Sequence, residues 1–372
     1  MKKLKHGGDI YSEGLLKGRK LLDFSSNINP LGVPKGFIEN INEGIEMLQV
    51  YPDIKYRTLK DNIINYLNKC SYYFGGEADE LNLTHESILL GNGASEIIDL
   101  AIRYLKSITI VVPSFVEYED NSHRYNLEVS YSYLKDDFTY DYEDILNKLN
   151  YSEGLIIGNP NNPNGSIIDK EKFISILDFC EENNKIVLID EAFIEFTGSS
   201  NYSLLNLVEK YKCLFIIKAI TKFYGLPGVR LGFGITKNKA LIDYIVSMQN
   251  PWNINCFAEL SAKYALSDEA YIRDSLKWIE TERKYMIEEL NKISIIEKCH
   301  NSYGNYVLCK LKGINCDKLY SYLEEKCIII RKCNNFRGLD DKSVRFAIKD
   351  RGSNEKLIEH LKNIDPLKIK DI

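Results

Sequence analysis

One lysine of the 372-residue sequence stands where it could do covalent chemistry. Lys222 follows Thr221 in a loop after the apolar run 213–217, and Arg230 comes shortly before a second apolar run. A lysine amine forms imines with aldehydes when its surroundings lower its pKa, and an arginine nearby can hold an anionic group of the same ligand. Taken alone, Lys222 could also be an ordinary solvent-exposed lysine in a loop.

A second segment is suited to binding phosphate. Residues 91–96, Gly-Asn-Gly-Ala-Ser-Glu, lie between a predicted strand and a predicted helix. Glycines let the backbone approach an anion closely, and a helix N-terminus offers free N–H groups with a favourable dipole. The N–H groups of Ala94 and Ser95, with the Ser95 hydroxyl, could hold a phosphate. A helix cap without any ligand is the alternative.

Two further polar segments follow apolar strands. Asn162 lies in the Asn-Pro-rich loop 159–165, after the run 155–157, and Asp190 ends the run 186–189. A carboxylate at a buried strand end is costly unless it is paired with a cation. Asp190 therefore either faces a cationic ligand group or caps the turn that follows.

The elements that position these residues alternate from residue 87 onward. Strands are expected at 88–90, 108–112, 127–133, 155–157, 186–189 and 213–217, and helices at 94–105, 115–125 and 170–182. This alternation is typical of βαβ units and predicts an α/β fold with a mostly parallel sheet. Ligands bind such sheets at the carboxyl ends of the strands, where the segments above fall.

The pattern changes toward both ends of the chain. After Pro251, helices from about 257 to 293, strands near 306–311, 327–331 and 343–348, and a last helix near 353 predict a smaller α+β domain. Near the start, a short strand precedes a turn-rich loop at 22–30, and Pro34 can open a helix through Ile45.

Composition excludes several classes of protein. Hydrophobic content of 44% and charged content of 27% are ordinary for a globular protein, and a net charge of −5 offers no bulk basic surface for nucleic acid. The nine cysteines show no metal-type spacing, so we expect free thiols and no metal. Without a signal sequence or an apolar run of about 20 residues, we expect a cytoplasmic protein that does not bind membranes.

The chain resembles fold-type I pyridoxal phosphate enzymes, the class I/II aminotransferase-like group. The resemblance lies in the order and the separations of five residues: Ser95, Asn162, Asp190, Lys222 and Arg230. The resemblance implies pyridoxal 5′-phosphate as cofactor, with Lys222 as the catalytic Schiff-base (internal aldimine) lysine. It implies an N-terminal arm with part of the small domain (1–50), a large cofactor-binding domain (51–255) and a C-terminal small domain (256–372).

The same resemblance assigns the cofactor contacts. Asp190 pairs with the ring nitrogen and makes the ring an electron sink, and Asn162 donates a hydrogen bond to the 3′-oxygen. Phe115 stacks on the ring, Ala94, Ser95 and Arg230 bind the phosphate, and Thr221 is a further cofactor contact. Tyr51 reaches the phosphate of the neighbouring subunit's cofactor, which implies a homodimer with shared active sites.

Further segments narrow the resemblance. The arm His6-Gly7-Gly8, the segment 251–255 and the loop Cys-Asn-Asn-Phe-Arg-Gly-Leu at 333–339 look like threonine-phosphate decarboxylases of cobalamin biosynthesis. The implied reaction converts L-threonine O-3-phosphate to (R)-1-amino-2-propanol O-2-phosphate and carbon dioxide. Arg345 matches the arginine for the substrate carboxylate, Arg331 and His6 match groups near the substrate phosphate, and Gly7, Gly8 and Asn162 complete the substrate contacts.

Three alternatives stay open. Histidinol-phosphate aminotransferases, which transfer an amino group to 2-oxoglutarate, are close kin and share the general motifs. Phosphoserine differs from phosphothreonine by one methyl group, and its decarboxylation would give ethanolamine phosphate. A non-enzymatic regulator that binds pyridoxal phosphate is disfavoured, because no DNA-binding segment is evident and the chain is acidic.

Overall fold

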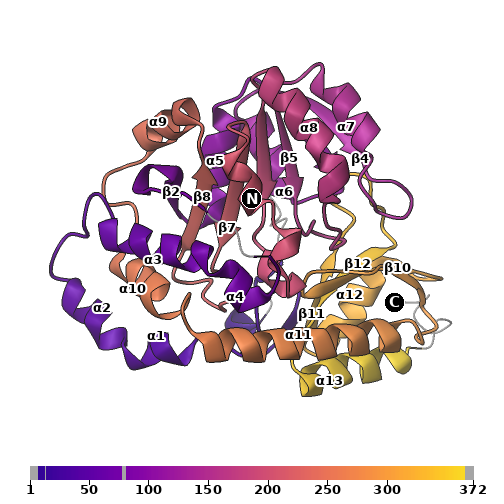
Figure 1. Cartoon of the computed structure of the whole chain (residues 1–372). Helices are drawn as coiled ribbons and strands as arrows, with labels where there is room; N and C mark the ends of the chain where they lie inside the picture. Colours follow the sequence, from indigo (N-terminus) through magenta and orange to yellow (C-terminus); the bar gives the residue numbers. More distant parts are fainter. Residues whose placement is uncertain (1–6, 13, 78–80, 365–372) are drawn as a thin grey trace.

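The computed structural model describes residues 7–12, 14–77 and 81–364, and Figure 1 shows two sheets surrounded by helices. The larger sheet has the strand order β2-β8-β7-β6-β5-β3-β4. Strand β8 runs antiparallel to β2 and β7, and all other neighbours are parallel. The predicted α/β class with a mostly parallel sheet is therefore confirmed. Its strands are β2 (Ile88–Asn92), β3 (Ser107–Val112), β4 (Glu128–Tyr133), β5 (Gly154–Gly158), β6 (Ile186–Asp190), β7 (Leu214–Ala219) and β8 (Leu231–Thr236).

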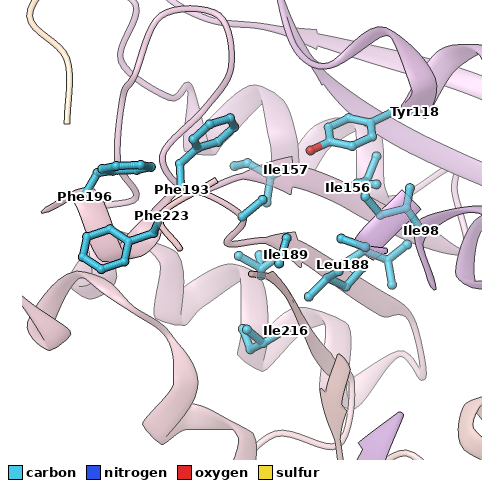
Figure 2. Packing of buried hydrophobic residues seen from close by; sticks show 14 of the residues in the cluster. Ile98, Tyr118, Ile156, Ile157, Leu188, Ile189, Phe193, Phe196, Ile216 and Phe223 are labelled. Carbon is cyan, nitrogen blue, oxygen red and sulfur yellow. The ribbon is translucent and has the colours of Figure 1, made fainter. Parts of the chain in front are cut away.

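The central strands form because both of their faces can be buried. Every residue of β5, β6, β7 and β8 is buried, as the continuous apolar runs predict for a sheet covered on both sides. Figure 2 shows aliphatic side chains of β5, β6 and β7 packed together. Each such side chain contributes roughly 1.5–3 kcal/mol by leaving water. The helices of this part are α5 (Ala94–Arg103), α6 (Val116–Arg124), α7 (Tyr142–Leu149), α8 (Lys170–Glu182) and α9 (Lys239–Met248).

The smaller sheet joins the two ends of the described chain. Its order is β1-β11-β12-β10-β9, and β1 pairs in parallel with β11. The strands are β1 (Leu22–Phe24), β9 (Ile296–Cys299), β10 (Tyr306–Leu311), β11 (Ile328–Lys332) and β12 (Ser343–Ala347), with helices α12 (Cys316–Glu325) and α13 (Arg351–Lys362). The long helix α11 (Glu269–Leu290) runs along the bottom of Figure 1 and contacts β10 and α13. The domain boundaries at 50 and 255 stay predictions.

One predicted helix differs in the structure. The helix expected from Pro34 through Ile45 is divided into α1 (Lys35–Glu39) and α2 (Ile41–Met47), because the Asn40 side chain donates to the Gly36 carbonyl at 2.8 Å and competes with the helical pattern. The remaining helices are α3 (Arg57–Asn68), α4 (Cys70–Phe74) and α10 (Cys256–Tyr264), with 3₁₀ turns at Leu15–Lys17, His85–Ser87, Ile194–Thr197, Ser200–Tyr202 and Leu205–Glu209. No helix in the described ranges is long and apolar enough to span a membrane.

Candidate active site

A pocket of about 290 Å³ lies at the carboxyl ends of the large-sheet strands and is closed on its other side by the small sheet. It brings together most of the residues predicted from the sequence: Gly7, Ala94, Ser95, Phe115, Asn162, Asp190, Thr221, Lys222, Arg230, Arg331 and Arg345. His6 lies outside the described residues. Gly8 seats the N-terminal arm beside the pocket, because its N–H donates to Ser25 Oγ at 2.7 Å.

Tyr51 does not reach this pocket in its own chain. Its side chain is 80% exposed, and its ring lies 4.8 Å from that of Trp252 on the outer surface. The predicted contact between Tyr51 and a neighbouring subunit's cofactor therefore stays a prediction.

One end of the pocket is an anion cradle. Helix α5 begins at Ala94, directly after β2, so its free N–H groups point at the pocket end where Ser95 and Arg230 lie. The Nη2 of Arg230 donates to Ser95 Oγ at 3.3 Å. A Cβ at Gly93, whose φ is +85°, would come within 2.3 Å of Arg230 Nη2, so only glycine allows this approach.

The opposite end carries a carboxylate. Asp190 is the last residue of β6 and is buried. Its Oδ2 accepts a hydrogen bond from the Tyr118 hydroxyl at 2.6 Å, and its Oδ1 accepts from the Ala192 N–H at 3.0 Å. Burial raises the pKa of Asp190 despite these donors. A protonated ring nitrogen in the pocket would supply the positive partner that the carboxylate needs.

Tyr118 was missed by the sequence analysis, although a signal for it existed. It follows Phe115 by three residues where a helix was expected, and residues at this spacing share one helix face. A phenol on the face that presents Phe115 to a ligand is a candidate for the same site.

Lys222 lies between the two ends. Burial, together with the positive charges of Arg345 and Arg230, lowers the pKa of its amine to about 8. Near this pH much of the amine is neutral, which is the form that attacks an aldehyde. The buried position of Lys222 after β7 therefore lowers the pKa of its amine, as imine formation with an aldehyde requires.

Two arginines of the small sheet close the pocket. Arg331 in β11 and Arg345 in β12 are directly opposite in the antiparallel ladder, so their side chains share one face. The guanidinium of Arg345 donates to Asn162 Oδ1 and, at 2.7 Å, to the Ser25 carbonyl, while its buried Nε has no hydrogen-bond partner among the described residues. Burial lowers the pKa of both, that of Arg331 to about 10.

The charges that line the pocket are unbalanced. Lys222, Arg230, Arg331 and Arg345 are cationic, and Asp190 is the one acidic side chain of the described lining. Four cations against one carboxylate give the pocket a net positive charge, so it is suited to a ligand set that brings several negative charges.

A buried ion cluster connects β7 with the segment that follows β6, and the sequence analysis did not predict it. Lys218 Nζ lies 3.3 Å from Glu191 Oε2 and 3.3 Å from Glu195 Oε1. Although burial acts to lower the pKa of Lys218, the two carboxylates raise it. Removing one partner of a buried pair costs about 3–5 kcal/mol, so this cluster holds the segment after β6 against β7.

These residues fit pyridoxal 5′-phosphate. The cradle at Ser95 and Arg230 suits its phosphate, the amine of Lys222 suits its aldehyde, and the carboxylate of Asp190 suits its ring nitrogen. A Cβ at Gly232 would lie 2.2 Å from the Ala94 nitrogen, so the backbone itself is shaped for close approach at the phosphate end.

The chain is similar to known proteins in sequence over nearly its full length. The family model "Aminotransferase class I and II" matches residues 19–361. A relative from Caldanaerobacter subterraneus subsp. tengcongensis, provisionally named threonine-phosphate decarboxylase, is 39% identical over 98% of this chain and 95% of its own. The threonine-phosphate decarboxylase of Salmonella typhimurium is 28% identical, with 96% of each chain covered.

Among solved structures, one described as the histidinol-phosphate aminotransferase from Clostridium acetobutylicum superposes with a TM-score of 0.86. It is 49% identical and covers 94% of this chain and 99% of its own. The sequence relatives and this structure therefore point to the same fold and to two different reactions.

Proposed function

This chain belongs to the class I and II aminotransferase family, and we propose that it decarboxylates L-threonine O-3-phosphate to (R)-1-amino-2-propanol O-2-phosphate and carbon dioxide. The observation that carries the proposal is the pair of buried arginines, Arg331 and Arg345, beside Lys222. A substrate with a phosphate and a carboxylate has two negative groups, each of which a guanidinium can bind through parallel hydrogen bonds. The decarboxylase names of the two sequence relatives support the choice of reaction.

Pyridoxal 5′-phosphate is the cofactor of this family, and when bound it supplies an electron sink for the bond that breaks at Cα of the substrate. In our proposal Ser95 and Arg230 bind its phosphate and Asp190 pairs with its ring nitrogen. Lys222 holds the cofactor and returns a proton to Cα after carbon dioxide leaves; an amine with a pKa of about 8 can do both near neutral pH.

The substrate is held by the small sheet. Arg345 binds the α-carboxylate, with its guanidinium oriented by Asn162 and by the Ser25 carbonyl. Arg331 binds the substrate phosphate together with the arm around Gly7. Two planar guanidiniums set the orientation of the substrate, and thereby which bond at Cα is broken.

Histidinol-phosphate amino transfer is the second candidate, and the 49% identity to the Clostridium acetobutylicum structure favours it. Histidinol phosphate also carries a phosphate for Arg331, and the carboxylates of 2-oxoglutarate suit Arg345. The arginine pair is therefore compatible with both reactions, and a direct assay must separate them.

The assay uses purified protein loaded with pyridoxal phosphate. With L-threonine phosphate we expect carbon dioxide and the amino-propanol phosphate without any keto acid, and no glutamate from histidinol phosphate plus 2-oxoglutarate. The reverse pattern would overturn the decarboxylase assignment. L-Serine phosphate is the third substrate, and the missing methyl group should reduce kcat/KM by about 10- to 200-fold.

We also propose a homodimer with shared active sites. Many exposed apolar side chains lie on α1, α2 and the loop that follows, and at or after the end of α9: Ile38, Ile41, Ile45, Leu48, Val50, Tyr51, Ile54, Val246, Met248 and Trp252. Tyr51 and Trp252 connect the two groups, because their rings lie 4.8 Å apart. Exposed apolar surface of this kind marks an association surface. Analytical ultracentrifugation should give a dimer, and Val50→Asp should shift it toward monomer. An active wild-type monomer would contradict the proposal.

The lowered pKa of Lys222 predicts how the apoenzyme captures its cofactor. Because only the neutral amine attacks an aldehyde, the capture rate should rise as pH increases and level off above about 8, rather than near the ordinary lysine value of 10.5. Stopped-flow absorbance over a pH series measures this, with Nα-acetyl-lysine as the control amine. A midpoint near that of the control would show that the pocket does not lower the pKa.

A further inference from the structure

Tyr118 is a buried phenol that the proposed reaction leaves without a role. It comes from α6, and Figure 2 shows its ring beside the aliphatic side chains of Ile98 and Ile156. The hydroxyl donates to Asp190 Oδ2 at 2.6 Å. A buried hydroxyl needs a hydrogen-bond partner. The partner of this hydroxyl is the same carboxylate that is proposed to pair with the ring nitrogen of the cofactor.

Asp190 depends on few donors. Besides the phenol, the Ala192 N–H is the other hydrogen-bond donor to its carboxylate within the described structure. Besides Tyr118, the charged and titratable groups around it are Lys222 and Glu191, from the loops after β7 and β6, and Tyr306 of β10. The positive charge of Lys222 favours the ionised form of Asp190, and the negative charge of Glu191 disfavours it. Each donor therefore counts in keeping this buried carboxylate ionised.

We propose that Tyr118 is a positioning residue that keeps Asp190 ionised and fixes its free lone pairs toward the cofactor's ring nitrogen. The inference rests on the proposed role of Asp190 in the cofactor site, and it is independent of which substrate the enzyme uses. An ionised Asp190 holds the ring nitrogen protonated, and the protonated ring withdraws electrons more strongly.

Helix α6 also explains why the phenol is held so firmly. The rings of Phe115 and Tyr118 meet edge to face at 5.7 Å, and the Ser122 hydroxyl donates to the Tyr118 carbonyl at 2.7 Å. One helical turn therefore carries both the aromatic ring expected on the cofactor's face and the phenol that orients Asp190.

The test compares Tyr118→Phe with Tyr211→Phe. Tyr211 is the matched control, because it is also a buried phenol that donates to an aspartate, Asp178, at 2.7 Å but lies outside the pocket lining. Hydrogen bonds to charged groups are worth enough that Tyr118→Phe should weaken pyridoxal phosphate binding about 10- to 100-fold. Tyr211→Phe should leave this affinity within about 2-fold of wild type.

Two readouts separate this role from simple packing. With cofactor labelled by ¹⁵N in the ring, Tyr118→Phe should move the nitrogen resonance toward the unprotonated position, and the control should not. In an Asp190→Asn background, Tyr118→Phe should cause no further loss of cofactor affinity beyond about 2-fold, because the phenol acts through Asp190. An unchanged nitrogen resonance, or losses that multiply, would overturn the proposal. Neither readout needs a substrate, so failure of the decarboxylase assignment would not affect them.

Discussion

Replacing Lys222 with alanine should reduce kcat for carbon dioxide release by at least about 10³-fold, because no other amine of the described pocket lining can take its place. Arg230, Arg331 and Arg345 are the other cationic groups there, and a guanidinium stays protonated and cannot act as a nucleophile or a proton donor near neutral pH. The assay measures carbon dioxide and the amine product from L-threonine phosphate at saturating cofactor.

The variant should remain folded. Lys222 is a buried cation whose pKa is lowered, so alanine removes an unfavourable charge at the same time as it leaves a void in the ligand pocket. Thermal unfolding of the apoprotein should therefore change little. Lys239→Ala is the matched control, because this exposed lysine of α9 pairs with Asp243 on the surface. A Lys222→Ala enzyme that kept a tenth of the wild-type rate would show that this amine is not the reacting group.

The site residues that could be predicted from the sequence are those fixed by strand ends. Asp190 ends β6 and Lys222 lies shortly after β7, and parallel strands bring their carboxyl ends to one edge of the sheet, so their proximity follows from local patterns. The role of Gly91 and Gly93 in an anion-binding turn could be predicted for the same reason, because the strand, the turn and the start of the helix are adjacent in sequence.

The residues that were missed depend on contacts between distant segments. Tyr118 meets Asp190 across 72 positions of sequence, and Lys218 meets Glu195 across 23. Their pairing is set by the strand order and by how α6 packs, which local periodicity does not contain. The division of the helix at Asn40 shows the opposite limit: a single side-chain hydrogen bond outweighs the periodic pattern.

The facing of Arg331 and Arg345 also required the structure. Each could be singled out in sequence, but only the antiparallel register of β11 and β12 shows that their side chains leave the sheet on the same face. That register turns two separate arginines into one site for a ligand with two anionic groups, and it makes the effect of removing one of them predictable.

Replacing Arg345 with lysine should reduce kcat/KM by about 30- to 1000-fold while pyridoxal phosphate affinity changes less than about 3-fold. Lysine keeps the positive charge but not the planar guanidinium. The guanidinium donates to Asn162 and to the Ser25 carbonyl, and it can also offer two parallel N–H groups to a carboxylate. An ammonium group cannot do both. Arg345→Ala should lower kcat/KM further, because the substrate carboxylate would then lose both the positive charge and the hydrogen-bond donors of this side chain.

The comparison that decides this role is between substrate and cofactor. Arg351→Lys is the matched control, because Arg351 pairs with Glu282 at the start of α13 and does not line the pocket. Steady-state kinetics with L-threonine phosphate give kcat/KM, and titration of the apoenzyme gives cofactor affinity. Equal losses of both in Arg345→Lys would contradict a substrate role, because a group that binds the substrate carboxylate acts only after the cofactor is in place. A loss confined to kcat/KM would tie the small sheet to substrate recognition and the large sheet to the cofactor, each through residues at its own strand ends.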